Sequence, residues 1–348
     1  MTVATAKNVI ATGLGEFSKA KFNALLNVRG TALTALRNTL FKIGYTEVST
    51  SSLVNIAGSC ENPYASFTLN YYGRDAHLSQ SAQLQLEALV IRLKRGVFTV
   101  NNSFREENYD DPEAQGRRLS EFTLIEPEMP YEGLGADEAL NQIIATEEQL
   151  IKSATHEVLK NHEQDIRLLN GKVDYLKSTL EQPFNRLTYD EALELLNKKG
   201  GNYKFGDDLE VREERAILEH FNNMPTFVTH YPAAIKFFNM KKMDDNERVY
   251  SVDLLTPRLG ETSGGAVREE NPEKIKAYFL ESQIASYIQE RNGDPFETFR
   301  EYFNLFEQEE PTLRGGFGIG FERFVGFLLN SNDILDTIAY RAMQPSYN

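Results

Sequence analysis

The feature that most constrains the fold is a pair of strand-like segments on either side of a long polar loop. Residues 97–104 and 121–128 contain several β-branched and aromatic residues, and the loop at 106–116 is polar. Two such segments joined by a loop predict an antiparallel hairpin with an enlarged tip. A hairpin of this kind, set among helices, favours an α+β architecture over a regular alternation of strands and helices.

Helical segments and further strands surround this hairpin. Apolar residues recur at helical spacing over residues 21–42. Thr188 with Glu191 three residues later forms a capping box, and Asn271 before Pro272 is a helix start. We therefore predict helices at about 21–42, 84–95, 136–170 and 321–329, and two more that begin after Thr188 and Asn271. Strands are expected at 45–48, 226–229 and 315–320, and on both sides of a turn at 241–247.

Composition narrows the class of protein. In 348 residues, 41% are hydrophobic and 25% charged, as in a soluble globular chain with one large domain or a core with an insertion. The net charge of -14 disfavours a protein whose main task is to hold a nucleic-acid backbone. A single cysteine, Cys60, excludes an internal disulfide and a cysteine zinc site. Without a long apolar run or signal peptide, we expect a cytoplasmic protein with no membrane partner.

The hairpin carries residues suited to a nucleotide. Arg105, at the end of the first strand, can offer a planar donor fork to a phosphate. Glu107, two residues on along the same face, can accept from an exocyclic amine, and Phe122 offers a flat surface for a base. Taken alone, the segment fits a charged hairpin tip with one core aromatic equally well.

Two later segments add charges that suit phosphates. A glycine-rich strand at 315–320 leads into a helix whose first turn contains Arg323, where a cation opposes the helix dipole and predicts a paired anion. Asp253 and Glu261 can hold Mg²⁺ on phosphate oxygens, and Arg268 can take a carboxylate or amide oxygen. Alone, this last segment also fits a solvated turn with a salt bridge. Together, the three segments suit an ATP that is attacked at its α-phosphate.

In these residues the chain resembles the class II aminoacyl-tRNA synthetases, in the asparaginyl and aspartyl branch, over about residues 28–339. The resemblance implies an α+β fold, with a mostly antiparallel sheet flanked by helices. It also implies an N-terminal arm at 1–20, a catalytic domain at 21–348 with a helical insertion at 131–225, and a homodimer through the first helix and strand.

The resemblance also implies roles at the ATP site. Arg105 would contact the α-phosphate and the reacting carboxylate, and Glu107 would read the adenine amine. Phe122 and Arg323 would stack on the two faces of adenine, and Arg323 would also hold the γ-phosphate. Asp253 and Glu261 would carry Mg²⁺. Arg118 stands where the family has a histidine and keeps a donor there.

For the amino acid, the resemblance implies that Glu61 receives the ammonium group and that Gln83 belongs to a loop lining the pocket. Arg268 would face the side-chain carbonyl or carboxylate. Aspartyl enzymes have a lysine where this chain has Leu86. Its absence, with Glu87 nearby as a further expected residue of the amino-acid pocket, favours an amide-like side chain or a different orientation of the substrate.

Three hypotheses for the function follow. The first is an AMP-forming ligase that activates an aspartate- or asparagine-like amino acid and passes it to ammonia or another small amine. In this it resembles stand-alone asparagine synthetases related to asparaginyl-tRNA synthetase. Only some 27 residues precede the resemblance, so we expect no anticodon-binding domain and no tRNA partner. The alternatives are tRNA aminoacylation without that domain, and a non-catalytic paralogue that binds ligand.

Overall fold

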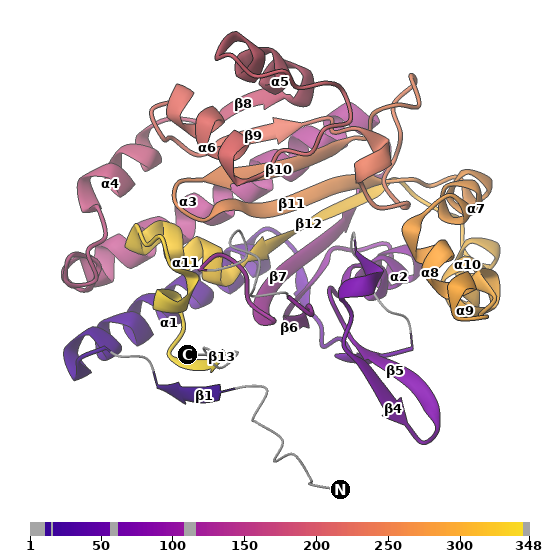
Figure 1. Cartoon of the computed structure of the whole chain (residues 1–348), viewed down its shortest axis with the longest axis horizontal. Coiled ribbons are helices and arrows are strands. Elements are labelled where there is room, and N and C mark those ends of the chain that lie inside the picture. Colours follow the sequence, from indigo (N-terminus) through magenta and orange to yellow (C-terminus); the bar gives the residue numbers. More distant parts are fainter. Residues whose placement is uncertain (1–10, 15–16, 56–61, 108–115, 344–348) are drawn as a thin grey trace, which may run out of the picture.

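The computed structural model describes residues 11–14, 17–55, 62–107 and 116–343. Their centre is an eight-stranded sheet (Figure 1). Its inner neighbours pair antiparallel, and the pair at each edge is parallel, which confirms the α+β architecture with a mostly antiparallel sheet. The strand order is β2 (Thr46–Glu47), β6 (Val97–Phe104), β7 (Glu121–Pro130), β12 (Arg314–Gly320), β11 (Gly260–Arg268), β10 (Ser251–Thr256), β9 (Thr226–Thr229) and β8 (Asn185–Thr188).

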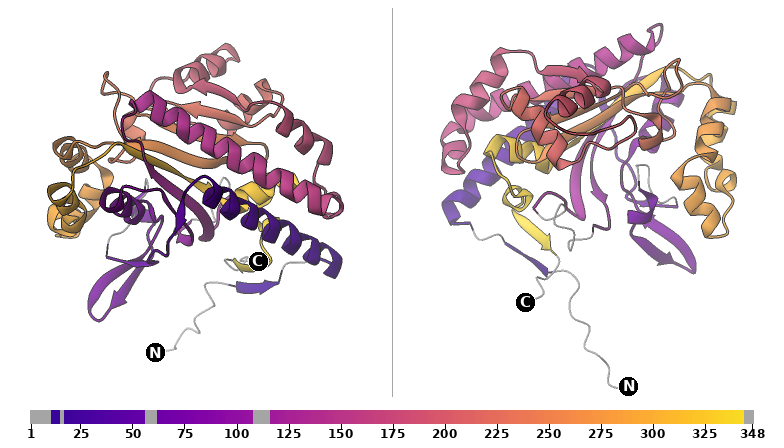
Figure 2. Two further views of the ribbon diagram at one scale, coloured as in Figure 1. Left: turned by 180° about the vertical axis from the view of Figure 1, so that it is seen from behind. Right: turned by 45° about the horizontal axis from the view of Figure 1, so that its top comes forward.

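Long helices cover one face of this sheet. Helices α1 (Lys19–Lys42) and α3 (Ala136–Leu168) lie side by side across it (Figure 2, left). The apolar stripe predicted for the first helix is buried there, with Leu25, Leu36 and Leu40 fully inaccessible to solvent. Each such side chain contributes about 1.5–3 kcal/mol on burial. Helix α11 (Phe321–Leu329) joins the same core, which makes this face the rigid support of the sheet.

The opposite face is only partly covered and holds the site described below. Shorter elements frame it at its ends: α2 (Gln83–Leu93), α6 (Val211–His220), and a cluster of α7 (Pro272–Leu280), α8 (Gln283–Glu290), α9 (Pro295–Thr298) and α10 (Arg300–Gln308). A small sheet of β3 (Leu53–Val54), β5 (Arg74–Leu78) and β4 (Thr68–Tyr71) projects from the body, and β1 (Ala11–Leu14) pairs with β13 (Tyr340–Met343). No helix in the described part of the chain is both long and apolar enough to cross a membrane.

The region predicted as a helical insertion, residues 131–225, contains α3, α4 (Val173–Glu181), α5 (Tyr189–Lys198) and α6, and also strand β8. The predicted cap at Thr188 is confirmed, because its side chain accepts from the amide of Glu191 and the Glu191 carboxylate accepts in return. The cap at Asn271 is also confirmed, because its side chain accepts from the backbone amides of Glu273 and Lys274, with Pro272 at the first helical position.

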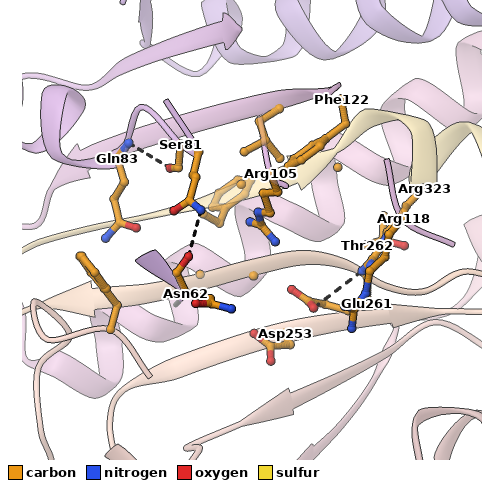
Figure 3. Close-up of a pocket in the computed structure, with 18 of the residues that line it drawn as sticks. Asn62, Ser81, Gln83, Arg105, Arg118, Phe122, Asp253, Glu261, Thr262 and Arg323 are labelled. Carbon is orange, nitrogen blue, oxygen red and sulfur yellow. Dashed lines mark hydrogen bonds and ion pairs between the residues drawn. The ribbon is translucent and has the colours of Figure 1, made fainter. Parts of the chain in front are cut away.

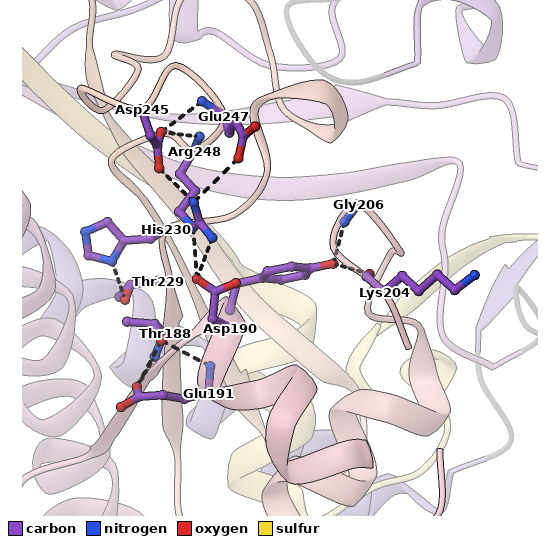
Figure 4. Close-up of polar contacts among 11 residues, drawn as sticks. Thr188, Asp190, Glu191, Lys204, Gly206, Thr229, His230, Asp245, Glu247 and Arg248 are labelled. Carbon is purple, nitrogen blue, oxygen red and sulfur yellow. Dashed lines mark hydrogen bonds and ion pairs between the residues drawn. The ribbon is translucent and has the colours of Figure 1, made fainter. Parts of the chain in front are cut away.

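One predicted pair of strands is only half right. The strand after the turn at 241–247 is β10, which begins at Ser251, but the segment before the turn forms only isolated bridges, such as Lys242 with Val249. Asp245 folds the turn on itself, since its carboxylate accepts from the backbone amides of Glu247 and Arg248 at 2.8 and 3.0 Å. Arg248 then reaches Asp190 of α5 at 2.9 Å (Figure 4). The turn therefore anchors the inserted helices to the sheet instead of extending it.

Candidate active site

A cavity of about 640 Å³ lies over the open face of the sheet. Its lining comes from β7, β10, β11 and β12, from the segment after β6, and from α2, α6 and the start of α11. Figure 3 shows Arg105, Arg118, Phe122, Asp253, Glu261 and Arg323 around this space. The three sequence segments that suggested a nucleotide site thus meet in one place.

The predicted hairpin holds the first group of these residues. Phe122 pairs with Ser103 across β6 and β7, and Arg105 follows directly after β6. The backbone amide of Arg105 donates to the carbonyl of Ser120 at 3.0 Å, which fixes the end of the strand. The Arg105 guanidinium lies 5.2 Å from the centroid of the Phe122 ring. The cation therefore lies over the ring in this structure, and both groups that a base and its phosphate require are in one place.

Glu107 and Arg118 occupy the outer rim of the cavity. Their side chains form an ion pair at 3.4 Å across the hairpin tip. The Arg118 side chain is 46% exposed and that of Glu107 only 14%, so the arginine faces solvent and the carboxylate faces inward. Arg118, which replaces a histidine of the resembled family, keeps a donor at the mouth of the cavity.

Arg323 has the anionic partner that the helix dipole predicted. Its guanidinium donates to the backbone carbonyl of Glu261 and lies 3.7 Å from the carboxylate of the same residue. Burial acts to raise the pKa of Glu261, but the fields of Arg323, Lys236 and Arg105 outweigh it and place that pKa below its usual value. The carboxylate is therefore ionised at neutral pH.

Asp253 and Glu261 converge over a glycine. A Cβ on Gly264 would lie 3.0 Å from one oxygen of Glu261 and 3.2 Å from one of Asp253. The convergence depends on a β-bulge, because Ser263 pairs with Leu254 and Glu261 with Leu255, leaving Thr262 between them. The extra residue turns Glu261 to the same face as Gly264.

The two carboxylates fit Mg²⁺ bound mainly through phosphates. Among the described residues, no group of three or more His, Cys, Asp or Glu side chains is arranged to hold a metal. Mg²⁺ in nucleotide sites uses one or two carboxylates and takes its other ligands from phosphate and water. Lys236, 2.8 Å from Asp253, adds a cation beside the same phosphates.

The other end of the cavity is closed by a buried ion pair. The guanidinium of Arg268 donates to both carboxylate oxygens of Glu128 at 3.1 Å, and the two side chains are 4% and 2% exposed. Gly316 makes room for them, since a Cβ there would lie 2.1 Å from Glu128 Oε2. The absence of a side chain at Gly316 thus lets the Glu128 carboxylate pack directly against the backbone of the glycine-rich strand.

Of the other residues predicted for the amino-acid pocket, the structure places one in the cavity and one outside it. Gln83 begins α2 and lines the cavity. Glu87, one turn further on, is fully buried and does not line it, because its carboxylate pairs with Arg314 behind the cavity. Glu61 lies outside the described residues.

A family model described as tRNA synthetases class II (D, K and N) matches residues 13–344. The chain belongs to this family. An asparagine–tRNA ligase of Pyrococcus furiosus is 35% identical over 327 residues, covering 93% of this chain and 68% of the relative. One from Microcystis aeruginosa is 31% identical over 339 residues, with 91% and 69% covered.

A solved structure of one relative has a similar fold. The crystal structure of asparaginyl-tRNA synthetase from Pyrococcus horikoshii, complexed with asparaginyl-adenylate, matches with a TM-score of 0.80 and 33% identity. The match covers 94% of this chain and 69% of that one. The chain therefore spans about two thirds of the length of these relatives.

Sequence reasoning missed several residues that line the cavity. Glu126 and Glu128 alternate along β7 on the face of Phe122, and this acidic repeat in a buried strand was the available signal. Glu214 of α6 had no such signal. It accepts from Arg117 at 3.0 Å and from the amide of Glu261 at 3.3 Å, and burial, with help from Glu261 and against Arg323, raises its pKa to about 7.

Proposed function

We propose that this chain uses ATP to activate asparagine as an aminoacyl-adenylate. The observation that supports it is the Arg268–Glu128 pair at the closed end of a cavity whose other end suits ATP. A side-chain amide has one acceptor and one donor group. Arg268 can donate to its carbonyl oxygen, and Glu128 can accept from its amino group.

Charge favours asparagine over aspartate at this position. The pair is neutral as a unit, since each charge already has its partner. A neutral amide adds no charge, whereas an aspartate carboxylate would lie beside the carboxylate of Glu128 in a nearly dry environment. Unpaired or like charges in such sites are disfavoured by several kcal/mol. The named relatives, which are asparagine–tRNA ligases, support the same choice.

The proposed reaction needs no protein nucleophile. An oxygen of the α-carboxylate attacks the α-phosphorus, a new P–O bond forms, and the bond to the pyrophosphate oxygen breaks. Arg105, beside Phe122, stabilises the developing charge at the α-phosphate, and Arg323 holds the departing pyrophosphate. Mg²⁺ on Asp253 and Glu261 would supply further charge neutralisation to the phosphate oxygens.

The proposed acceptor of the asparaginyl group is the terminal hydroxyl of a tRNA, by likeness to the named relatives. That hydroxyl attacks the adenylate carbonyl and AMP leaves. This replaces our first expectation, a transfer to ammonia, as the main proposal.

A second candidate rests on the same pair of residues. The head group of an amino acid also presents an acceptor and a donor, its carboxylate and its ammonium. If aspartate binds turned around, Arg268 holds the α-carboxylate, Glu128 holds the ammonium, and the side-chain carboxylate faces ATP. Ammonia would then open the adenylate to give asparagine and AMP.

One experiment separates these functions. Pyrophosphate exchange into ATP is measured with asparagine and with aspartate, and products are then identified after adding ammonium or tRNA. Exchange with asparagine and acylated tRNA supports the main proposal, whereas exchange with aspartate and release of free asparagine supports the second. Exchange with neither amino acid contradicts both.

We also propose a homodimer through α1 and the adjoining β2. Leu26 and Phe41 of α1 are 47% and 49% exposed, although the apolar stripe of that helix, such as Leu25 and Leu36, is buried. Large apolar side chains exposed together on one helix suit a second copy related by a two-fold axis. Sedimentation equilibrium should give twice the mass of one chain for the wild type. The double variant Leu26→Glu/Phe41→Glu should give the mass of a single chain.

A further inference from the structure

A second ion pair lies directly behind the one that closes the cavity. Arg314 and Glu87 are 0% exposed and meet at 2.6 Å. Arg314 stands opposite Arg268 in the pairing of β12 with β11. Two glutamates and two arginines, from α2, β7, β11 and β12, thus form one buried cluster with no net charge. The cavity is lined by Arg268 and Glu128, but by neither member of the second pair.

Arg314 is committed to this position by several contacts. Its Nε and Nη2 both donate to Oε2 of Glu87, at 3.0 and 2.6 Å. Its Nη1 donates to the backbone carbonyl of Glu269 at 3.2 Å, so Arg314 also holds the chain next to Arg268. Glu87 accepts in addition from the side chains of Asn239 and Tyr302.

The cluster creates a choice of partner for Arg268. Residues directly opposite on adjacent antiparallel strands have Cβ atoms about 4.5–5.5 Å apart, and like charges there repel. Arg268 interacts with both carboxylates. Burial acts to lower its pKa, but Glu128 and then Glu87 raise it above the usual value. As long as Arg314 saturates Glu87, Arg268 remains with Glu128 and faces the substrate.

We propose that Arg314 and Glu87 are positioning residues for the amino-acid pocket, because their ion pair keeps Arg268 on Glu128 in the geometry that recognises the substrate. The inference rests on the proposed adenylation. Removing Arg314 alone leaves Glu87 as an uncompensated buried carboxylate that draws Arg268 out of the pocket. Removing both charges leaves Arg268 with Glu128 as its only partner in the cluster.

The test is a double-mutant cycle in pyrophosphate exchange, with KM measured separately for asparagine and for ATP. Arg314→Met should raise KM for asparagine about 10-fold or more, with KM for ATP changed less than about 2-fold. The double variant Glu87→Gln/Arg314→Met should return KM for asparagine to within about 3-fold of the wild type. Arg314→Lys, which keeps the charge, should stay close to the wild type.

Controls separate positioning from simple support of the fold. Arg300→Met, at an exposed arginine of α10 whose partners are Glu297 and Glu301, should leave both KM values unchanged. If Arg314→Met does not fold, the double variant and Arg314→Lys carry the test. An equal rise of both KM values in Arg314→Met, or a folded double variant with asparagine KM still raised 10-fold, overturns the proposal.

The two proposals fail in different ways. If the wild type exchanges pyrophosphate with another amino acid and not with asparagine, the proposed function is wrong. The cycle is then measured with that amino acid, and recovery in the double variant still supports the positioning role.

Discussion

The two ends of the cavity hold their charges in opposite ways. At the ATP end, the side chains of Arg118, Glu261 and Arg323 are 46%, 45% and 26% exposed, and the Lys236–Asp253 pair beneath them is 9% and 10% exposed. At the amino-acid end, Arg268 and Glu128 are 4% and 2% exposed and already bonded to each other. The first end presents charges that solvent stabilises until phosphates arrive. The second presents a pair that is neutral before any substrate binds.

The difference indicates how each end selects its ligand. Exposed charges gain affinity from a highly charged ligand and tolerate small changes in its position. A buried pair discriminates by what it leaves unpaired, since a substrate that lacks a donor or an acceptor leaves a desolvated group without a hydrogen bond. We therefore expect variants at the ATP end to change rate and ATP affinity, and variants at the other end to change selectivity.

The largest expected effect is at the ATP end. Arg323→Ala should lower the rate of pyrophosphate exchange by about 10²–10³-fold, because it removes a positioned cation at the site of charge development. Its thermal midpoint should stay near that of the wild type, since Arg323 is partly exposed and its bonds, to the backbone carbonyl and the carboxylate of Glu261, join it to one residue alone. Exchange at the wild-type rate would mean that this arginine does not hold the phosphates.

At the amino-acid end, Glu128→Gln should reduce the preference for asparagine over aspartate by about 10–100-fold. Arg268 then loses its carboxylate partner and can pair with the side-chain carboxylate of aspartate instead. Burial raises the pKa of Glu128 to about 7, against the opposing effect of Arg268, so protonation below pH 7 should act in the same direction. The wild-type preference should therefore fall from pH 8 to pH 6, and that of the variant should stay constant. A pH-independent wild-type ratio would contradict this account.

Glu214 of α6, which lies beside Glu261 at the ATP end, gives a test of stability. The Glu214 pKa of about 7 lies above its ordinary 4.5, mainly through burial. Between these values the unfolded carboxyl ionises while the folded one keeps its proton, so this contribution to stability is present below pH 4.5 and lost as pH rises to 7. Urea unfolding should show that Glu214→Gln lacks this loss. Glu219→Gln, exposed on the same helix, should retain it.

The smallest effect is expected at the exposed rim. Arg118→Ala removes a 3.4 Å ion pair with Glu107 whose arginine is nearly half exposed. Such pairs contribute about 0–1 kcal/mol, so KM for ATP should rise about 5-fold or less. A loss of exchange as large as that expected for Arg323→Ala would show that the rim binds phosphate as strongly as Arg323 does, and would contradict this ranking.

Local patterns in the sequence identified much of the ATP end. Arg105 and Phe122 flank a predicted hairpin, and β6 begins and ends at the residues expected. The dipole of a helix start required an anion for Arg323, and Glu261 is that anion. These features depend on neighbours in sequence or on a single strand pairing, which periodicity and turn chemistry specify.

Tertiary structure decided what the local patterns could not. The partner of Arg268 is 140 residues away on β7, and Glu87, expected in the pocket, is instead bound to Arg314 at a separation of 227. The β-bulge at Thr262, which turns Glu261 toward Asp253, is a matter of register between two strands. The sequence by itself determined which elements form and which charges they carry. Only the packed sheet determined which of those charges pair with each other and which remain for a substrate, because a buried charge takes the partner that the strand order places beside it.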